Sequence, residues 1–308
     1  MEHGTPMGAE IVTIVMATLN GAAHLPAQLA SIARQAHPWR LFVSDDGSSD
    51  ATLEILVDFA RHHSVTVVQG PGRGTAAANF MSALCHPALP AGPVALADQD
   101  DVWFAGRLSR AMRHLAGASG PALYGSESVL TDDRLVPLRR SRSGPLRPGF
   151  GNALCQNLFG GHTIVMNAPA LDLIRRAGPP LGIAYHDWWI YQLIAGAEGK
   201  LLLDPRPTAR YRQHQGNSLG GLSGRSGSLR RLAMVLSGRW RADMRAQARA
   251  LNAVRPLLLP AAQARLDGYL AAASFGPARA VGLQRAGVVR SSRAGTAAML
   301  AACMLGLI

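Results

Sequence analysis

Cysteine is scarce in this sequence, and no segment is long and apolar enough to span a membrane. Its three cysteines, Cys85, Cys155 and Cys303, lie far apart with no metal-binding spacing, which predicts buried thiols of a cytosolic protein. No run reaches the roughly eighteen apolar residues that a spanning helix needs. Residues 1–6 contain neither a basic nor an apolar region, so we expect no signal peptide. The segment 294–308 is either an interfacial segment or a buried terminal helix.

Positive charge is concentrated in one part of the chain. The 308 residues carry a formal net charge of +12. Residues 221–308 contain 13 Arg and no Lys against Asp243 and Asp267, whereas residues 1–220 are nearly neutral. This asymmetry indicates an interaction surface at the C-terminal end and no nucleic-acid partner. We therefore expect a domain at 1–220 with one large core, followed by a basic helical extension at 221–308.

Short apolar runs and helical segments alternate in the first 115 residues. The runs are rich in β-branched residues and lie at 11–16, 41–43, 65–68 and 94–97. Segments with helical apolar spacing follow at 25–36, 50–62 (with Asp50 as N-cap), 75–85 and 105–115. This alternation predicts βαβ units and a mostly parallel sheet. Because the carboxyl ends of parallel strands meet at one edge, we expect the polar clusters there to surround a nucleotide-type ligand.

The pattern is less regular after residue 120. We expect strands at 122–130, 163–166, 201–203 and 209–211. We expect helices at 169–177, 186–197, 229–236, 242–253 and 261–273, the last three amphipathic and basic. The loop 139–149 and the Gly/Ser-rich linker 216–227 separate these elements.

Three carboxylates, those of Asp98, Asp100 and Asp101, directly follow the apolar run 94–97 and precede Trp103. Adjacent acids repel one another, and burying them at a strand end is costly. A divalent cation such as Mg²⁺ or Mn²⁺ removes this cost, because it binds carboxylate oxygens and bridges to substrate phosphates. The alternative is a solvated acidic turn that caps the next helix.

Asp45 and Asp46 end another predicted strand and precede Gly47. Carboxylates at this position can accept hydrogen bonds from a pyrimidine N3–H or a ribose hydroxyl, and Gly47 lets the backbone turn close to a ligand. An acidic turn with a helix cap is the alternative. The glycine-rich loop 70–74 lacks the spacing and position of a dinucleotide-binding fingerprint, and it is either a loop beside a nucleotide or a plain turn.

Asp187 lies between His186 and two tryptophans at the start of a predicted helix. Flanking apolar rings would raise the pKa of this carboxyl group, which suits a base that takes a proton from a hydroxyl. The alternative is a helix N-cap beside core tryptophans. His214 follows a predicted strand, and it is either a surface histidine or a nitrogen ligand that, with Asp100, favours Mn²⁺.

Five motifs occur in the order and spacing of family 2 glycosyltransferases. They are Thr18-Leu19-Asn20-Gly21, Asp45-Asp46-Gly47-Ser48-Ser49-Asp50, Ala97-Asp98-Gln99-Asp100-Asp101-Val102-Trp103, His186-Asp187-Trp188-Trp189 and Tyr211-Arg212-Gln213-His214. The chain resembles this family over about residues 10–220. More narrowly, it resembles the bacterial rhamnosyltransferases that build cell-surface polysaccharides. The resemblance implies a GT-A fold, which is an α/β, Rossmann-like, mostly parallel sheet flanked by helices, with a C-terminal helical extension.

The resemblance also implies a reaction and a set of site residues. A sugar, with dTDP-L-rhamnose as the expected donor, would pass with inversion to a saccharide or lipid-linked acceptor, with Mn²⁺ or Mg²⁺ bound, and Asp187 would be the base. The nucleotide-sugar donor would contact Thr18, Asn20, Asp45, Asp46, Asp98, Gln99 and Asp100. The metal would be held by Asp98, Asp100 and His214. The sugar and acceptor pocket would include Asp101, Trp103, His186, Trp188 and Trp189.

The C-terminal part departs from the processive members of the family. Those proteins carry a Gln-x-x-Arg-Trp motif and transmembrane helices, whereas here Leu236 stands in place of Gln before Arg239-Trp240. We therefore expect single-sugar addition. The basic residues 221–308 predict docking on anionic lipid at the cytoplasmic face of the inner membrane, and a helical cap on the catalytic domain is the alternative.

Other functions fit parts of the same pattern. A non-catalytic nucleotide-sugar binding protein would keep Asp45 and Asp98 but need no base at Asp187. A transferase that uses a UDP- or GDP-sugar would carry the same motifs. A sugar nucleotidyltransferase would need a basic glycine-rich loop near the N-terminus, and residues 18–24 contain neither Lys nor Arg. A retaining glycosidase would need two carboxylates facing one bond and no metal.

Overall fold

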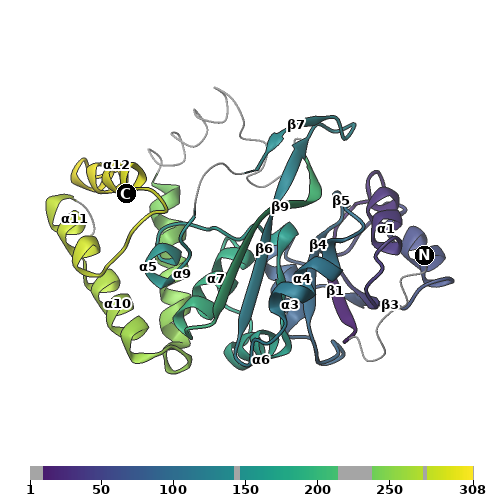
Figure 1. The fold of residues 1–308 in the computed structure, drawn as a ribbon, viewed down its shortest axis with the longest axis horizontal. Helices are drawn as coiled ribbons and strands as arrows, with labels where there is room; N and C mark the ends of the chain where they lie inside the picture. The colour runs from purple at the N-terminus through teal and green to yellow at the C-terminus, as the bar shows by residue number, and fades with distance from the viewer. Residues whose placement is uncertain (1–9, 142–145, 214–237, 273–275, 308) are drawn as a thin grey trace.

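The computed structural model describes residues 10–141, 146–213, 238–272 and 276–307, and it shows a sheet with helices on both faces (Figure 1). The strands are β1 (Val12–Thr18), β2 (Trp39–Asp45), β3 (Val65–Gln69), β4 (Val94–Asp98), β5 (Val102–Trp103), β6 (Ala122–Thr131), β7 (Pro137–Arg140), β8 (Val165–Met166) and β9 (Lys200–Arg212). The helices are α1 (Leu25–Ala33), α2 (Thr52–Ala60), α3 (Ala76–Leu84), α4 (Arg107–Leu115), α5 (Phe150–Ala153), α6 (Ala168–Ala177), α7 (His186–Gly196), α9 (Arg239–Ala253), α10 (Pro260–Ala271), α11 (Gly276–Arg285) and α12 (Arg293–Met304), with 3-10 turns η1 (Gly161–Thr163) and η2 (Arg255–Leu257). The strand order is β3-β2-β1-β4-β8-β6-β9-β5, and β7 pairs with β6.

The strands β3, β2, β1 and β4 form the parallel sheet that the sequence predicted. β1 pairs in parallel with both β2 and β4, and β2 pairs in parallel with β3. The register places Thr18 beside Asp45 and Ala17 beside Asp98. The carboxyl ends of three strands, each followed by a polar cluster, therefore meet at one edge of the sheet.

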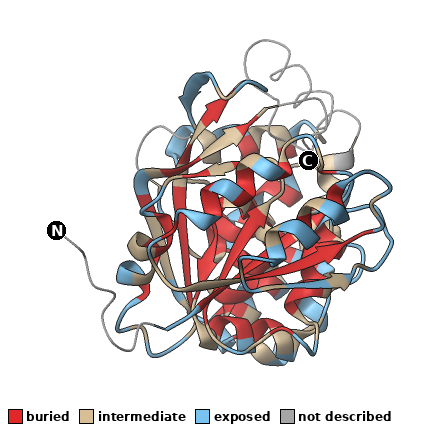
Figure 2. Ribbon diagram, turned by 90° about the vertical axis from the view of Figure 1, so that its right-hand side faces the viewer, coloured by how far each residue is buried: buried red, intermediate tan, exposed pale blue. Residues whose placement is uncertain are grey.

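Side chains alternate across this part of the sheet and fill two cores. Ile14 and Met16 of β1 lie in the core that also contains Leu29 of α1 and Leu108 of α4. Val15, between them, faces the opposite core, to which α3, α6 and α7 contribute. Burial of each apolar side chain of this size stabilises the fold by roughly 1.5–3 kcal/mol. Figure 2 shows the strands as a buried layer between the helices, which holds the strand ends in place.

Beyond β4 the sheet is mixed. β8 is antiparallel to both β4 and β6, whereas β6 and β9 run parallel. The short strands expected at 201–203 and 209–211 are parts of one strand, β9, whose register shifts opposite residues 126–129. Pro205 and Pro207 lie at this irregularity. Proline has no backbone N–H to donate, and here the regular hydrogen bonding between β6 and β9 is already interrupted. The two prolines made a continuous strand look interrupted in the sequence.

Several predicted boundaries are wrong for local reasons. α2 begins at Thr52, and Asp50 precedes its cap residue, although the Asp50 carboxylate still accepts a hydrogen bond from the Thr52 N–H at 3.0 Å. The strand expected at 163–166 is the end of η1 followed by the two-residue β8. The strands β5 and β7 and the helix α11 were not predicted, because each is short or lacks clear periodicity.

The C-terminal helices share a core with the sheet domain. The indole ring of Trp240 in α9 stacks on Trp188 of α7, with ring centroids 5.2 Å apart. Met244, Leu251 and Leu266 are buried in the core that contains Val15. The helix α9 therefore packs against α7, and Figure 1 shows α10 to α12 farthest from β3.

Two further points concern membrane spans and unplaced segments. Among the described residues, no helix combines the length and apolar character needed to cross a bilayer. The predicted domain boundary at 220, the linker 216–227, the helix 229–236 and His214 lie outside the described residues.

Candidate active site

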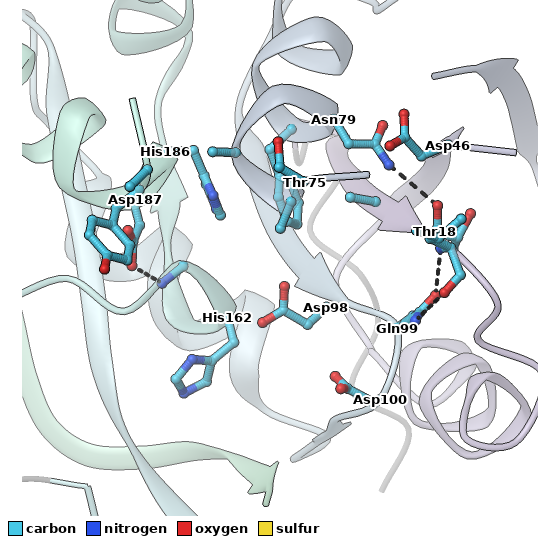
Figure 3. Close-up of a pocket in the computed structure, with 18 of the residues that line it drawn as sticks. Thr18, Asp46, Thr75, Asn79, Asp98, Gln99, Asp100, His162, His186 and Asp187 are labelled. Carbon is cyan, nitrogen blue, oxygen red and sulfur yellow. Dashed lines mark hydrogen bonds between the residues drawn. The ribbon is translucent and has the colours of Figure 1, made fainter. Parts of the chain in front are cut away.

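A cavity of about 670 Å³ opens at the carboxyl ends of β1 and β4. Figure 3 shows Thr18, Asp46 and Asn79 on one side of it, and His186 and Asp187 on the other. Asp98 lies between the two sides, and Asp100 and His162 lie below it in this view. The strand ends that the sequence predicted to converge therefore surround a single cavity.

The two adjacent carboxylates after β2 have different surroundings. Asp45 accepts hydrogen bonds from the hydroxyls of Thr18 (2.7 Å) and Ser48 (2.6 Å), and from the backbone N–H groups of Ser48 (2.8 Å) and Gly47 (3.2 Å). Burial acts to raise the pKa of Asp45, but the hydrogen bonds from Ser48, Thr18 and Gly47 outweigh it and lower that pKa. Asp45 stabilises the turn and does not line the cavity, whereas Asp46 does.

Asp46 holds the glycine-rich loop against the cavity. Its Oδ1 accepts a hydrogen bond from Gly72 N–H at 2.7 Å, and its Oδ2 accepts one from Gly74 N–H at 2.6 Å. A Cβ added at Gly70 would lie 2.9 Å from Asp46 Oδ1, so the loop approaches the carboxylate only without a side chain there. The loop ends at Thr75, which caps α3 and lines the cavity.

Amide side chains join the strand ends to one another. Gln99 bonds to both the N–H and the C=O of Leu19, each at 3.0 Å, and it lines the cavity. Asn20 has a positive φ of 49°, accepts a hydrogen bond from Ser49 N–H at 2.8 Å and does not line the cavity. Asn79, which the sequence did not single out, donates to the carbonyls of Ser44 (2.9 Å) and Thr18 (3.3 Å). These hydrogen bonds join the ends of β1 and β2 to one another, to α3 and to the segment after β4.

The acidic residues at the end of β4 and just after it are in an environment that disfavours their negative charge. Burial, followed by the neighbouring charges of Asp100 and Asp187, raises the pKa of Asp98 to about 7. Burial, and then the charges of Asp100 and Asp98, raise the pKa of Asp101 well above its usual range. Asp101 is fully buried, its Oδ1 accepts the Arg212 N–H at 3.1 Å, and its Oδ2 is buried without a hydrogen-bond partner. A positive charge at this position would offset the repulsion.

One group of side chains here fits a divalent metal. Ligand atoms of Asp98, Asp101 and His162 all lie within 4.8 Å of one another. Two carboxylates and an imidazole suit Mn²⁺ better than Mg²⁺, because Mg²⁺ prefers oxygen ligands. The Oδ2 atom of Asp101 has no hydrogen-bond partner and is available as a ligand. Of the ligands expected from the sequence, Asp98 belongs to this group and Asp100 lines the cavity beside it. Asp101, which was expected in the wall of the sugar pocket, is buried and does not line the cavity.

His162 was missed in the sequence. The structure places its ring on that of Tyr211, with centroids 4.0 Å apart and planes at 12°, and its Nε2 lies 3.0 Å from the Ser128 hydroxyl. The one sequence signal was a histidine after two glycines, Gly160 and Gly161, just before an apolar run. The contact partners that orient the ring are far away in the chain, so the sequence did not reveal it.

Asp187 lies at the first turn of α7 with both oxygens held by backbone N–H groups. Oδ2 accepts a hydrogen bond from Gly161 at 3.0 Å, and Oδ1 accepts one from Trp188 at 2.7 Å. A Cβ added at Gly161 would lie 2.9 Å from Nε2 of His186. The carboxylate therefore faces the cavity in a defined orientation that depends on a glycine.

The structure places the three tryptophans expected in the pocket in the hydrophobic core. Trp103, Trp188 and Trp189 are at most 2% exposed and do not line the cavity. Trp188 donates its Nε1–H to the Ala153 carbonyl at 2.6 Å, which fixes the helix that carries Asp187. Burying these large rings in the core stabilises the fold more than exposing them at the site would.

His186 does line the cavity, as expected, and its ring stacks on that of Phe80 with centroids 4.3 Å apart. Burial lowers the pKa of His186, so its ring is held neutral near physiological pH. Phe80, Tyr185 and Tyr211 also line the cavity, although the sequence did not single them out as pocket residues.

Comparison with proteins of known sequence identifies a family. Residues 13–160 match the family model of glycosyl transferase family 2. The dTDP-rhamnosyl transferase RfbG of Shigella flexneri is 25% identical over 250 residues, which are 77% of this chain and 84% of that protein. The UDP-Glc:alpha-D-GlcNAc-diphosphoundecaprenol beta-1,3-glucosyltransferase WfgD of Escherichia coli is 25% identical over 130 residues, 41% of this chain and 49% of that protein.

Solved structures show the same fold. The mannosyltransferase PcManGT from Pyrobaculum calidifontis, in complex with GDP-Man and Mn²⁺, has a TM-score of 0.55 at 20% identity, and the match covers 98% of this chain and 87% of that chain. TarS of S. aureus in complex with UDP-GlcNAc has a TM-score of 0.54 at 13% identity, with 90% and 89% covered. The predicted GT-A fold is thus confirmed, and residues 13–160 of this chain match glycosyl transferase family 2.

Proposed function

We propose that this protein is an inverting glycosyltransferase that moves a sugar from a nucleotide diphosphate to a hydroxyl group of a saccharide or lipid-linked acceptor. One observation supports this most: Asp46 and Asp187 lie on opposite sides of one cavity, with Asp98 between them (Figure 3). A donor with its nucleotide toward Asp46 and its diphosphate toward Asp98 would present its sugar toward Asp187.

Asp187 is the proposed base. The acceptor hydroxyl gives its proton to the Asp187 carboxylate, and its oxygen forms a bond to the anomeric carbon of the donor sugar. The nucleotide diphosphate leaves with the electron pair of the broken C–O bond, and attack from the opposite side inverts the configuration. The hydrogen bonds from Gly161 and Trp188 keep the carboxylate oriented for this proton transfer.

Asp98, Asp101 and His162 would hold a divalent metal, with Asp100 beside them. A bound Mn²⁺ or Mg²⁺ supplies positive charge that stabilises the departing diphosphate. The buried acidic residues are suited to this role because their mutual repulsion favours a cation at the site.

The donor we propose is dTDP-L-rhamnose, and the pathway is cell-surface polysaccharide synthesis. The relative from Shigella flexneri, whose name gives a dTDP-rhamnosyl transferase, matches the greater part of both chains. A UDP- or GDP-sugar is the alternative donor, because the other relative and the solved structures have names that include these nucleotides. A non-catalytic nucleotide-sugar binding protein is the alternative function.

We also propose that the C-terminal helices dock on an anionic membrane at the cytoplasmic face, where a lipid-linked acceptor would lie. Apolar side chains are exposed there, including Leu270, Met304 and Leu305, and so are Arg265 and Arg293. Exposed apolar and cationic side chains together favour an anionic lipid surface. The relative from Escherichia coli is named for a lipid-diphosphate acceptor, which supports the same placement.

The first experiment is thermal stabilisation by nucleotide sugars, each with Mn²⁺, with Mg²⁺ and with a chelator. A ligand at one hundred times its Kd adds about 2.7 kcal/mol of stability, which shifts the melting temperature measurably. We expect metal-dependent stabilisation by dTDP-L-rhamnose. Stabilisation by a UDP- or GDP-sugar instead would show that dTDP-L-rhamnose is not the donor. Stabilisation by none of the nucleotide sugars would contradict the proposed function.

A further inference from the structure

A second cavity, of about 360 Å³, adjoins the active-site cavity. His162, Tyr211 and Gly160 line both cavities, so the stacked rings of His162 and Tyr211 form part of the wall between them. Gly160 directly precedes Gly161, whose N–H binds the proposed base Asp187. The second cavity is therefore next to the base side of the active site, away from Asp46.

The lining of the second cavity is polar but carries little charge. Three serines and an asparagine contribute hydroxyl and amide groups to it, and two leucines contribute apolar surface. These residues are Ser126, Ser128, Ser141, Asn157, Leu130 and Leu158. Among the described residues that line this cavity there is no Asp, Glu, Lys or Arg.

The Ser141 hydroxyl group is held in place by hydrogen bonds to β6. Ser128 N–H donates to the Ser141 hydroxyl oxygen at 2.9 Å, and Ser141 N–H donates to the Ser128 carbonyl at 2.8 Å. The Ser141 hydroxyl oxygen thus accepts one bond and keeps its own hydrogen to donate. Asn157 accepts the Phe159 N–H through Oδ1 at 3.0 Å, which sets the direction of its amide.

We propose that the second cavity binds one neutral sugar ring of the acceptor, an inference that rests on the glycosyltransferase function proposed above. Hydroxyl and amide groups match the donors and acceptors of a sugar, and the two aromatic rings and two leucines of the lining offer apolar surface to its C–H groups. The cavity volume falls within the roughly 300–1,000 Å³ of small-molecule sites.

The lining of the second cavity is not suited to bind the diphosphate group of a lipid-linked acceptor. A diphosphate group needs cationic side chains or clustered N–H donors, and this lining offers no Lys or Arg. The acceptor therefore places a sugar in this cavity and its anionic group elsewhere.

The test measures binding of neutral methyl glycosides by saturation-transfer NMR on the full chain. The probes are the methyl pyranosides of L-rhamnose, D-glucose, D-galactose and N-acetyl-D-glucosamine at millimolar concentration. The variant Ser141→Phe fills the cavity, and Leu138→Phe, on the exposed strand β7, is the matched control. We expect the wild-type signal for at least one glycoside to fall at least five-fold in Ser141→Phe and to persist in Leu138→Phe.

A second variant tests the same cavity in case Ser141→Phe does not fold. Asn157→Asp keeps the acceptor atom for Phe159 N–H but replaces the amide donor by a negative charge, and it should also weaken glycoside binding at least five-fold. Nucleotide-sugar stabilisation must be unchanged in both variants. Unchanged glycoside binding in both, or no binding of any glycoside to a wild-type protein that nucleotide sugars stabilise, would overturn this inference alone. A wild-type protein that no nucleotide sugar stabilises would overturn the proposed function as well.

Discussion

The backbone N–H of Gly161 donates a hydrogen bond of 3.0 Å to Oδ2 of Asp187, across 26 positions of the chain. Gly161 begins η1 and Asp187 lies in the first turn of α7, so the bond joins two separate segments at the cavity. The backbone reaches the carboxylate because no side chain at Gly161 fills the space beside His186 Nε2.

Gly161→Ala should therefore reduce the rate of sugar transfer without weakening the binding of the donor. The new Cβ would lie 2.9 Å from His186 Nε2, so either the backbone at residue 161, which holds Asp187, or the buried His186 ring must shift. We expect kcat to fall by about 10²-fold, the effect of misplacing a catalytic group by roughly 1 Å. Gly106→Ala is the control, since a Cβ there meets nothing within 4 Å. Equal kcat values for the two variants would show that the Gly161 contact does not orient the base.

Asp187→Asn should abolish transfer and spare donor binding. The amide has nearly the size of the carboxylate but cannot accept the proton of the acceptor hydroxyl, and a general base contributes about 10²–10⁴-fold to a rate. Sugar transfer and nucleotide-sugar stabilisation are measured on the same preparation. Loss of stabilisation together with transfer would move Asp187 from the role of base to that of donor binding.

His162→Ala and Asp100→Ala test where the metal binds. We expect both variants to lose the Mn²⁺-dependent part of the stabilisation by dTDP, because one removes a member of the ligand group and the other removes charge beside it. His37→Ala is the control, since His37 bonds to the Glu10 carbonyl, outside the cavity. Full Mn²⁺ dependence in His162→Ala would exclude His162 from the metal site.

The buried carboxylate of Asp204 should stabilise the protein at neutral pH and lose this effect in acid. Arg110 donates to its Oδ1 at 2.8 Å, and the Tyr124 hydroxyl donates to its Oδ2 at 2.7 Å. Burial acts to raise the pKa of Asp204, but the hydrogen bonds from Arg110, the Arg206 N–H and Tyr124 outweigh it and lower that pKa to about 2.

A lowered pKa means that folding favours the ionised form. The stabilisation is complete above the unfolded-state pKa of 3.8 and disappears as the pH falls toward about 2. Asp204→Asn should lower the free energy of unfolding at pH 7 by roughly 2 kcal/mol, and the difference from wild type should narrow in acid. Urea unfolding at pH 7, 4 and 2.5 measures this. The same difference at all three pH values would contradict the assignment.

Binding of the C-terminal helices to anionic membranes can be tested by charge removal in the full chain. Deleting these helices would expose the core that Met244, Leu251 and Leu266 share with the sheet, so substitution is preferable. We expect the triple change Arg265→Gln, Arg285→Gln and Arg293→Gln to weaken binding to anionic liposomes by about 10²-fold, at about 1 kcal/mol per Arg. The control makes the same charge change at the exposed Arg34, Arg61 and Arg113. Equal losses in both triple variants would mean that net charge, and not this surface, attracts the membrane.

The parallel strands and the cluster of acids after them could be predicted from the sequence. The runs 11–16 and 94–97 are apolar and β-branched, and polar residues follow each run directly. Burial of a strand depends on its own residues, and the end of an apolar run marks the end of the strand. This is why Asp46 and Asp98 were expected at a ligand site, and the structure places both on one cavity. Asp187, which was expected from its position at a helix start, lies on the same cavity.

The roles of neighbouring polar residues were decided by the tertiary structure. Asp45 and Asp46 are adjacent and chemically identical, yet Asp45 bonds within its turn and Asp46 bonds to the loop 70–74 at the cavity. His162 reaches the acidic group because Tyr211, from a distant strand, stacks on it.

The four parallel strands β1 to β4 and the edge of the sheet at which they end follow from the local alternation of apolar and polar residues, so the sequence was sufficient to predict them. Contacts between distant segments decide which side chains face the cavity. Trp103, Trp188 and Trp189 stand within the site motifs but fill the core, since burying a large ring stabilises the fold more than exposing it at a site. That choice depends on contacts between segments far apart in the chain, which no local pattern contains.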